Sequence, residues 1–255
     1  MRRLGCACLL AFSAMSLYAD TSLPIPEEFE ALHADELLSF ARPGTWGTAA
    51  QRITIAAEIR KTRVEAGVQE SVGDENLCDT AEVPEAARRV ARAAALGGIE
   101  IDRAFCAKAQ ADGLTDGAYV EVIGLAARLA HLDVFARGIG VPSRQLAEPL
   151  EDTEPSMQRP AIARDEGFFT DSVPSAPDGG ELAREIYGDA VPAANILRSL
   201  SLVPDEARRL NRVVNVEYFN NDTMMDVTFS SLKDINRPQL ELVAAKISAL
   251  NQCFY

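Results

Sequence analysis

The sequence of 255 residues contains few histidines, cysteines and basic side chains, and each scarcity argues against a class of function. His33 and His131 are its only histidines and lie far apart, which leaves little for a histidine-rich metal site or a Ser-His-Asp triad. Five cysteines do not make a disulfide framework in a chain of this length. Lys and Arg number 25 against 38 Asp and Glu, and the net charge of −13 argues against binding to nucleic acids or to acidic membrane surfaces.

Long apolar runs are scarce as well. No segment after the amino terminus has about 18 consecutive apolar residues, so we expect no transmembrane helix. Residues 1–20 combine Arg2 and Arg3 with an apolar stretch and the small residue Ala19, which is the pattern of a secretory signal peptide. The alternative is a start codon placed too early, with Met15 as the first residue of the protein.

The spacing of apolar residues, which make up 47% of the chain, predicts an all-α fold because it follows the helical period nearly everywhere. We expect helices over residues 27–41, 48–65, 85–96, 101–111 and 116–137, and further helices near Glu181, Ala193, Asp205, Asp222 and Arg237. Residues 142–180 are rich in Pro, Ser, Asp and Glu, and we interpret them as a linker.

Two parts of the chain resemble each other at a constant offset of 120 residues, from Pro84 to Pro204. Residues 83–92 read VPEAARRVAR and residues 203–212 read VPDEARRLNR; the same ungapped offset pairs Glu121 with Glu241. A row of apolar residues also matches at this offset: Val120, Ile123, Ala127, Ala130 and Val134 align with Leu240, Val243, Ile247, Leu250 and Phe254. We therefore predict two copies of one helical unit, residues 21–141 and residues 181–255, on either side of the linker.

Glu241 and Cys253 are the candidate catalytic residues of the second copy. On one straight helix they would lie about 18 Å apart, so they meet only if the chain turns between them. We expect Asn251 to supply that turn, since asparagine tolerates the left-handed conformation just past a helix end. Cys253 would then begin a further helix, whose dipole favours a thiolate, and Glu241 would accept the thiol proton.

Residues 237–255, RPQLELVAAKISALNQCFY, resemble the core of the AhpD and carboxymuconolactone decarboxylase superfamily. The peroxidase branch of that family has Glu, eleven residues, Cys-x-x-Cys, three residues and His; Glu241 and Cys253 match its first two elements. The segments ARDEG (163–167) and NILRSLSL (195–202) look like the two-copy, alkylhydroperoxidase-related members.

The resemblance implies an antioxidant enzyme, a thiol-dependent peroxidase. Its substrate would be a peroxide, and a dithiol such as a lipoyl or thioredoxin-like protein would reset the redox pair. It also implies a homo-oligomer and requires no metal and no organic cofactor. We expect a cytoplasmic protein, because a cycling dithiol needs a reducing supply; export is the alternative if residues 1–19 are a signal peptide.

The sequence ends at Tyr255, inside the family motif. Because some relatives carry selenocysteine, encoded by UGA, at a motif cysteine, we expect a selenocysteine directly after Tyr255; an ordinary truncation or a native short protein are the alternatives. An incomplete second unit would expose Val243, Ile247 and Leu250, so we expect this form to aggregate.

The first copy is expected to be inactive, because Asp133 stands where the second copy has Cys253. We interpret Asp133 as a helix N-cap, Cys106 as an inert buried thiol, and Glu121 as a residue kept for structure, capping or a hydrogen bond near the interface of the copies. Two other functions stay open: a decarboxylase or lyase of the same superfamily, whose members usually lack the cysteine pair, and a non-catalytic helical scaffold or interaction protein.

Overall fold

The fold of the described residues is all-helical, as the sequence predicts. The computed structural model describes residues 16–70, 79, 81–150, 153–188, 193–219, 223, 226, 228–229 and 235–253. Within these ranges the only β pairing is one antiparallel bridge between Arg164 and Ser172. Residues 1–15 of the predicted amino-terminal segment and most of the helix expected near Asp222 lie outside the described residues.

The helices begin and end close to where the sequence places them. The first half contains α1 (Glu27–Phe40), α2 (Ala49–Glu65), α3 (Glu85–Ala95), α4 (Arg103–Ala111) and α5 (Asp116–Gly138). The second half contains α6 (Gly180–Tyr187), α7 (Asn195–Arg198), α8 (Pro204–Glu217) and α10 (Arg237–Leu250). Local chemistry fixes the start of α2, where Thr48 and Gln51 form a reciprocal capping box.

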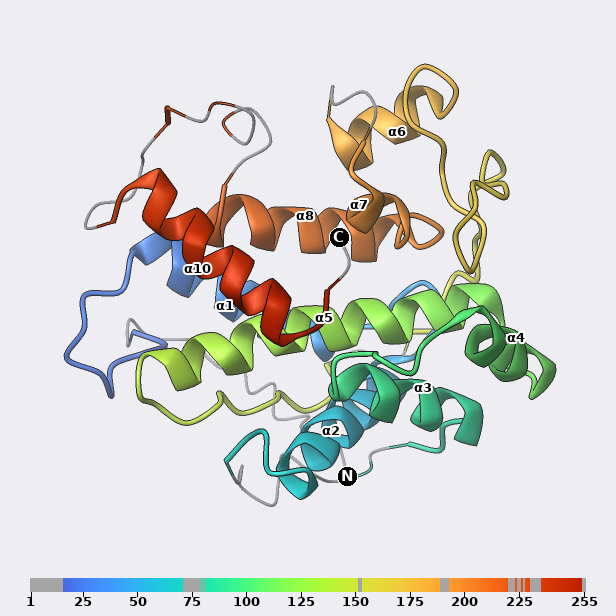
Figure 1. Cartoon of the computed structure of the whole chain (residues 1–255). Coiled ribbons are helices and arrows are strands. Elements are labelled where there is room, and N and C mark those ends of the chain that lie inside the picture. The colour runs from blue at the N-terminus through green and yellow to red at the C-terminus, as the bar shows by residue number, and fades with distance from the viewer. Residues whose placement is uncertain are drawn as a thin grey trace, which may run out of the picture.

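Helix α5 is the centre of the fold. It lies between α8 and the pair α2 and α3 (Figure 1), while α1 contacts α2, α5 and α8 and the short helices α6 and α7 pack on α8. One apolar core runs across all of these helices and includes Ile59 of α2, Leu125 and Leu129 of α5, and Leu210 of α8. This core joins residues of both predicted copies, and their relation as repeats stays a prediction.

The segment interpreted as a linker contains no helix before Gly180 among its described residues, but it is packed against the helices. The backbone N–H of Leu150 donates to the carbonyl oxygen of Ala41 at 2.8 Å. Val173 is fully buried, and its N–H donates to the Ser201 hydroxyl at 2.8 Å. These bonds tie the segment to both sides of the fold.

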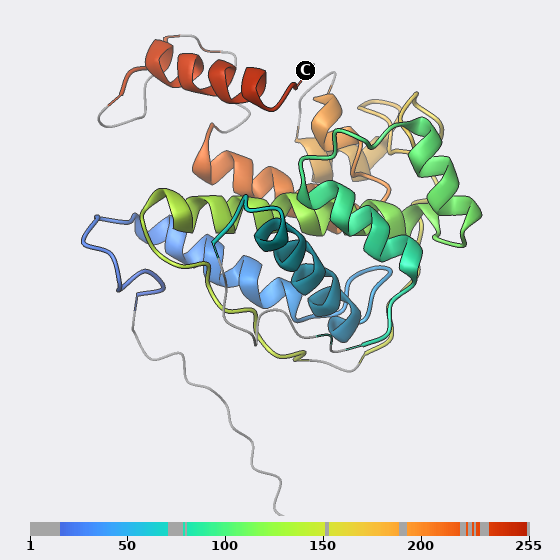
Figure 2. The ribbon, with the colours of Figure 1, turned by 60° about the horizontal axis from the view of Figure 1, so that its bottom comes forward.

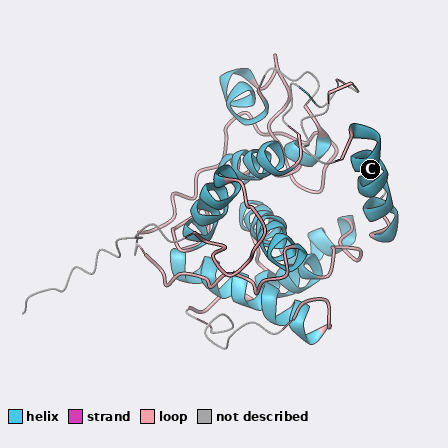
Figure 3. Cartoon of the chain, turned by 90° about the vertical axis from the view of Figure 1, so that its left-hand side faces the viewer, coloured by secondary structure: helices cyan, strands magenta, loops and turns pink. Residues whose placement is uncertain are grey.

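Helix α10 lies to one side of the other helices (Figures 2 and 3). Its amino-terminal end is attached by the guanidinium of Arg237, which lies 4.1 Å from the centre of the Phe219 ring. Four apolar side chains further along are between 51% and 72% exposed: Leu242, Val243, Ile247 and Leu250. The exposure predicted for the last three is therefore confirmed.

Candidate functional site

The structure does not bring the predicted pair Glu241 and Cys253 together. Glu241 begins the second turn of α10, and Cys253 follows the C-cap residue Asn251 by two positions. At 1.5 Å of rise per residue the twelve positions between them correspond to about 18 Å. Helix α10 continues to Leu250, and the chain turns at Gln252, directly before Cys253, which is too late to bring the two residues together.

A Schellman motif ends α10 and places Cys253 at its carboxyl end. The N–H of Cys253 donates to the carbonyl oxygen of Ser248 at 2.9 Å, and the N–H of Gln252 donates to that of Ala249 at 3.3 Å. Gln252 has a φ of 54°, whereas Asn251 has a φ of −84°, so the prediction of a left-handed Asn251 is wrong by one residue. Cys253 is exposed and lies near the negative end of the α10 dipole.

Glu241 is engaged in joining α10 to the end of α8. Its carboxylate accepts a hydrogen bond from Nε of Arg237 at 2.5 Å and one from the Tyr218 hydroxyl at 3.2 Å. Burial, with a contribution from the Glu241 charge, raises the pKa of Tyr218 above its ordinary value. The side chain of Glu241 is nevertheless 45% exposed.

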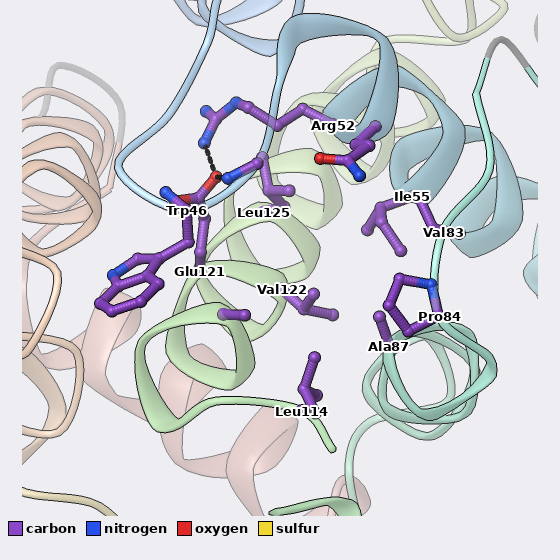
Figure 4. A pocket seen from close by; sticks show the side chains of 13 residues that line it. Trp46, Arg52, Ile55, Val83, Pro84, Ala87, Leu114, Glu121, Val122 and Leu125 are labelled. Carbon is purple, nitrogen blue, oxygen red and sulfur yellow. Dashed lines mark hydrogen bonds and ion pairs between the residues drawn. The ribbon is translucent and has the colours of Figure 1, made fainter. Parts of the chain in front are cut away.

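A cavity of about 130 Å³, which the sequence analysis missed, lies between α2, α3 and α5. Most of its wall is apolar (Figure 4), contributed by Ile55, Val83, Pro84, Ala87, Leu114, Ala118, Val122 and Leu125. Its polar side chains are Arg52, Glu121 and Gln51, and the indole of Trp46 completes it. Arg52 and Glu121 are paired at one end of the cavity, while the aliphatic side chains surround the other.

Glu121 is held from three directions. Its carboxylate accepts hydrogen bonds from the backbone N–H of Trp46 at 2.8 Å, from that of Gly47 at 3.3 Å, and from Nη1 of Arg52 at 2.6 Å. The turn before α2 approaches so closely that a Cβ on Gly44 would lie 2.1 Å from Oε1 of Glu121. Glu121 thus makes hydrogen bonds, which is one of the three roles predicted for it, while its place near an interface of two copies stays a prediction.

Two further carboxylates and a second guanidinium extend this pair through the core. Nη1 of Arg52 also donates to Glu206 of α8 at 3.1 Å. Arg128 of α5 holds Glu206 at two points, through Nε at 2.9 Å and Nη2 at 3.0 Å, and bonds to Glu36 of α1. All five side chains are buried, so each charge depends on its partners for compensation.

The row of alternating charges reaches the surface along α1 and α8. Nη1 of Arg209 donates to Glu36 at 3.0 Å and contacts Asp35 at 3.3 Å, and Asp35 in turn pairs with Arg212. Asp35 and Arg212 are substantially exposed. Four acidic and four basic side chains thus alternate from the cavity to solvent, and the row joins α1, α2, α5 and α8: Glu121, Arg52, Glu206, Arg128, Glu36, Arg209, Asp35 and Arg212.

The two carboxyl groups beside Arg52 have opposite pKa shifts. Burial raises the pKa of Glu121, and the neighbouring charge of Glu206 adds to the shift against the opposing effect of Arg52. Burial acts in the same direction on Glu206, but Arg128 and Arg52 together outweigh it and lower the pKa of Glu206. The carboxyl group that faces the cavity is therefore the one that is more easily protonated.

Asp133 is not a helix N-cap. It lies inside α5, where Arg60 binds both of its oxygens at 2.8 and 3.1 Å, and neither side chain is more than 1% exposed. The error arises because Asp favours N-cap positions in general, and the sequence does not show that an arginine of α2 faces it. Cys106, in contrast, is buried as predicted, and burial raises the pKa of its thiol.

Both histidines of the chain meet at one carboxylate. Nε2 of His33 contacts one oxygen of Glu217 at 2.7 Å, and Nδ1 of His131 contacts the other at 2.8 Å. The Tyr18 hydroxyl lies 2.7 Å from Nδ1 of His33. Although burial acts in the opposite direction, the two imidazoles lower the pKa of Glu217 to about 2. This cluster joins the amino-terminal segment, α1 and α5 to the end of α8.

The described residues contain neither a cluster of metal-ligating side chains nor a helix that could span a membrane. They contain no group of three or more His, Cys, Asp and Glu side chains arranged to hold a metal ion. Within the same part of the chain, no helix has the length and apolar character required to cross a bilayer. Comparison of the chain with models of protein families, with curated proteins and with solved structures finds no match.

Proposed function

We propose that this protein is a thiol-dependent peroxidase whose peroxide-reactive group is Cys253. The observation that carries the proposal is the position of Cys253: it is exposed at a tight turn, directly after a helix that presents Glu241 at the spacing of the AhpD-like motif. Exposure gives a peroxide access to the sulfur, which is the first requirement of the reaction.

The reaction begins with attack of the Cys253 thiolate on one oxygen of the peroxide bond. The O–O bond breaks, sulfur is oxidised to a sulfenic acid, and the other oxygen leaves as an alcohol or water. A second thiol or selenol then displaces water from the sulfenic acid, which leaves a disulfide or selenenyl sulfide. The motif that the chain resembles has this second group directly after the position of Tyr255. An external dithiol, such as a lipoyl or thioredoxin-like protein, reduces the pair and becomes a disulfide.

We assign Glu241 a positioning role in this reaction. Its distance along α10 from Cys253 is too long for direct proton transfer, and its carboxylate already accepts bonds from Arg237 and Tyr218. The thiol proton therefore passes to solvent at the exposed sulfur. Glu241 contributes by fixing the start of α10, and so the direction in which the helix presents Cys253.

The proposal is tested by treating the chain of 255 residues with one equivalent of hydrogen peroxide and trapping the sulfenic acid with dimedone. We expect one label per chain, located at Cys253 by peptide mass spectrometry and absent in Cys253→Ser. The buried Cys106→Ser variant is the matched control and keeps the label. A longer chain that carries the second thiol or selenol directly after Tyr255 is expected to reduce peroxide over many turnovers when a dithiol donor is supplied. A folded extended chain that consumes no peroxide would disprove the proposal.

A non-catalytic interaction protein is the second candidate, and the exposed apolar row on α10 favours it. That row is suited to contact another protein surface, including a second copy of this chain in a homo-oligomer. The trapping experiment separates the two candidates, because an interaction protein has no reason to react at Cys253 faster than an exposed model thiol.

A further inference from the structure

The cavity beside Trp46 has the size and the wall of a site for a small organic molecule. Its volume is about 130 Å³. Dry cavities of about 150 Å³ with aliphatic walls are known to take up benzene, so this cavity accommodates a compound of similar size. The aliphatic side chains of α2, α3 and α5 surround most of the space, and they favour a hydrocarbon body.

The charge balance at the polar end favours a neutral ligand. The Nη1 atom of Arg52 already contacts two carboxylates, at 2.6 Å for Glu121 and 3.1 Å for Glu206. An anion would add a third negative group next to one guanidinium. A cation would have to lie against Arg52 in a buried site, where like charges repel strongly. Only a neutral molecule leaves this arrangement of charges intact.

The polar end also has hydrogen-bonding capacity that the protein does not use. Nε1 of Trp46 and Nε of Arg52 are buried N–H donors on residues that line the cavity, and neither has a hydrogen-bond partner within the part of the chain that the structure describes. Buried donors in folded proteins are almost always paired, so an unpaired donor beside a cavity points to an acceptor that occupies the cavity. An oxygen atom on the ligand, which can accept a hydrogen bond from these N–H groups, meets this need.

From these observations we propose that the cavity binds a small neutral molecule with an aliphatic body and one oxygen, such as an alcohol, a ketone or a hydroperoxide. The oxygen lies at the end formed by Arg52 and Glu121, and the hydrocarbon lies against Ile55, Val122 and Leu125. The site is formed by the first half of the chain and does not involve Cys253. It therefore goes beyond the proposed peroxidase function and does not depend on it.

Trp46 provides a direct readout, because it is the only tryptophan of the chain. We would titrate the full chain with cyclohexanol and follow the emission of Trp46 together with the melting temperature. Saturable binding with a Kd in the millimolar range or below is expected, with a rise in melting temperature. Methylcyclohexane, which lacks the oxygen, and the cyclohexylammonium ion, which adds a charge, are expected to bind at least tenfold more weakly.

Two leucine substitutions on α5 form a matched pair for this experiment. Ala118 lines the cavity, whereas Ala127 lies on the same helix and is also partly buried but is not among the lining residues. Ala118→Leu is expected to weaken cyclohexanol binding at least tenfold, and Ala127→Leu is expected to leave it unchanged. If Ala118→Leu does not fold, Ala118→Val fills less space and is expected to weaken binding by a smaller factor.

The results of these titrations test the proposed ligand site and not the peroxidase proposal. Absence of saturable binding to the full chain, or equal binding by the folded Ala118 variants, would overturn the proposal. Equal binding of methylcyclohexane or of the ammonium ion would overturn the choice of a neutral oxygen compound. The Cys253→Ser variant is expected to bind cyclohexanol like the original chain, so failure of the peroxidase proposal would leave this result unchanged.

Discussion

Glu121 and Glu206 accept hydrogen bonds from the same guanidinium nitrogen, Nη1 of Arg52, although they come from opposite halves of the chain. The two carboxylates are not equivalent. Glu206 is also held at two points by Arg128, whereas Glu121 receives two backbone N–H groups and faces the cavity. The shared arginine therefore connects the wall of the cavity to a charge network that holds α1, α2, α5 and α8 together.

This asymmetry predicts unequal costs for neutralising the two residues. Glu206→Gln removes the charge that compensates two buried arginines, so we expect a loss of about 3–5 kcal/mol in the free energy of unfolding. Glu121→Gln leaves Arg52 paired with Glu206, and the loss is expected to stay below about 2 kcal/mol. Urea unfolding of both variants measures the difference. Equal losses in the free energy of unfolding would show that Glu121 and Glu206 contribute alike to stability, against this prediction.

The close approach of α8 to α5 predicts a steric effect at Gly124. A Cβ at this position would lie 2.6 Å from Oε2 of Glu206, so Gly124→Ala forces the buried carboxylate away from Arg128. We expect a loss of about 1–3 kcal/mol. Gly138, at the end of the same helix, has open space around it, and Gly138→Ala is expected to be neutral or to stabilise by up to about 1 kcal/mol. If Gly124→Ala is as stable as Gly138→Ala, the two helices are not in the close contact described above.

The histidine cluster predicts a loss of stability in acid. The pKa of Glu217 is about 2 in the folded protein against an ordinary value of 4.5, so its ionised form is favoured by folding. A lowered carboxyl pKa contributes stability above the unfolded value, and this contribution disappears as the pH falls from about 4.5 towards 2. It amounts to at most about 3 kcal/mol.

Glu217→Gln tests this assignment. The variant is expected to be less stable at neutral pH and to show a flatter decline in stability between pH 4.5 and 2, measured by urea unfolding at a series of pH values. The exposed Glu28→Gln variant controls for the loss of one surface charge. A decline as steep as that of the original chain would mean that other carboxylates are responsible.

The sequence predicted the helices well because their evidence is local. Apolar spacing, the capping box at Thr48 and the prolines before α3 and within the first turn of α8 are visible within a few residues. The charge network was not predicted, because Arg52, Arg128 and Glu206 look like ordinary surface charges until their helices are placed side by side. One sign of the network is visible in the sequence. Arg52 occupies a position of α2 at helical spacing from the apolar residues Ala49 and Ala56, where an apolar side chain would be expected.

The two described cysteines are predicted to differ in reactivity. Cys253 is exposed, while Cys106 is 1% exposed and has a pKa raised by burial, so few of its thiols are ionised at neutral pH. Brief treatment of the folded chain with iodoacetamide, followed by peptide mass spectrometry, is expected to modify Cys253 at least tenfold faster than Cys106. In denaturant the two rates are expected to become similar. Equal rates in the folded chain would contradict the burial of Cys106.

The apolar row on α10 predicts self-association of this chain. Leu242, Val243, Ile247 and Leu250 are all more than half exposed, and exposed apolar side chains gathered on one helix favour contact with other molecules. Ile247 and Leu250 are already largely exposed to water, so replacing them removes little buried apolar area from the folded chain. Ile247→Lys combined with Leu250→Lys is therefore expected to reduce aggregation and binding of a hydrophobic dye without lowering the melting temperature. Light scattering and thermal denaturation measure the two effects. A fall of several degrees in melting temperature would show instead that these side chains pack within the folded chain, since burial of two large aliphatic residues contributes about 3–6 kcal/mol.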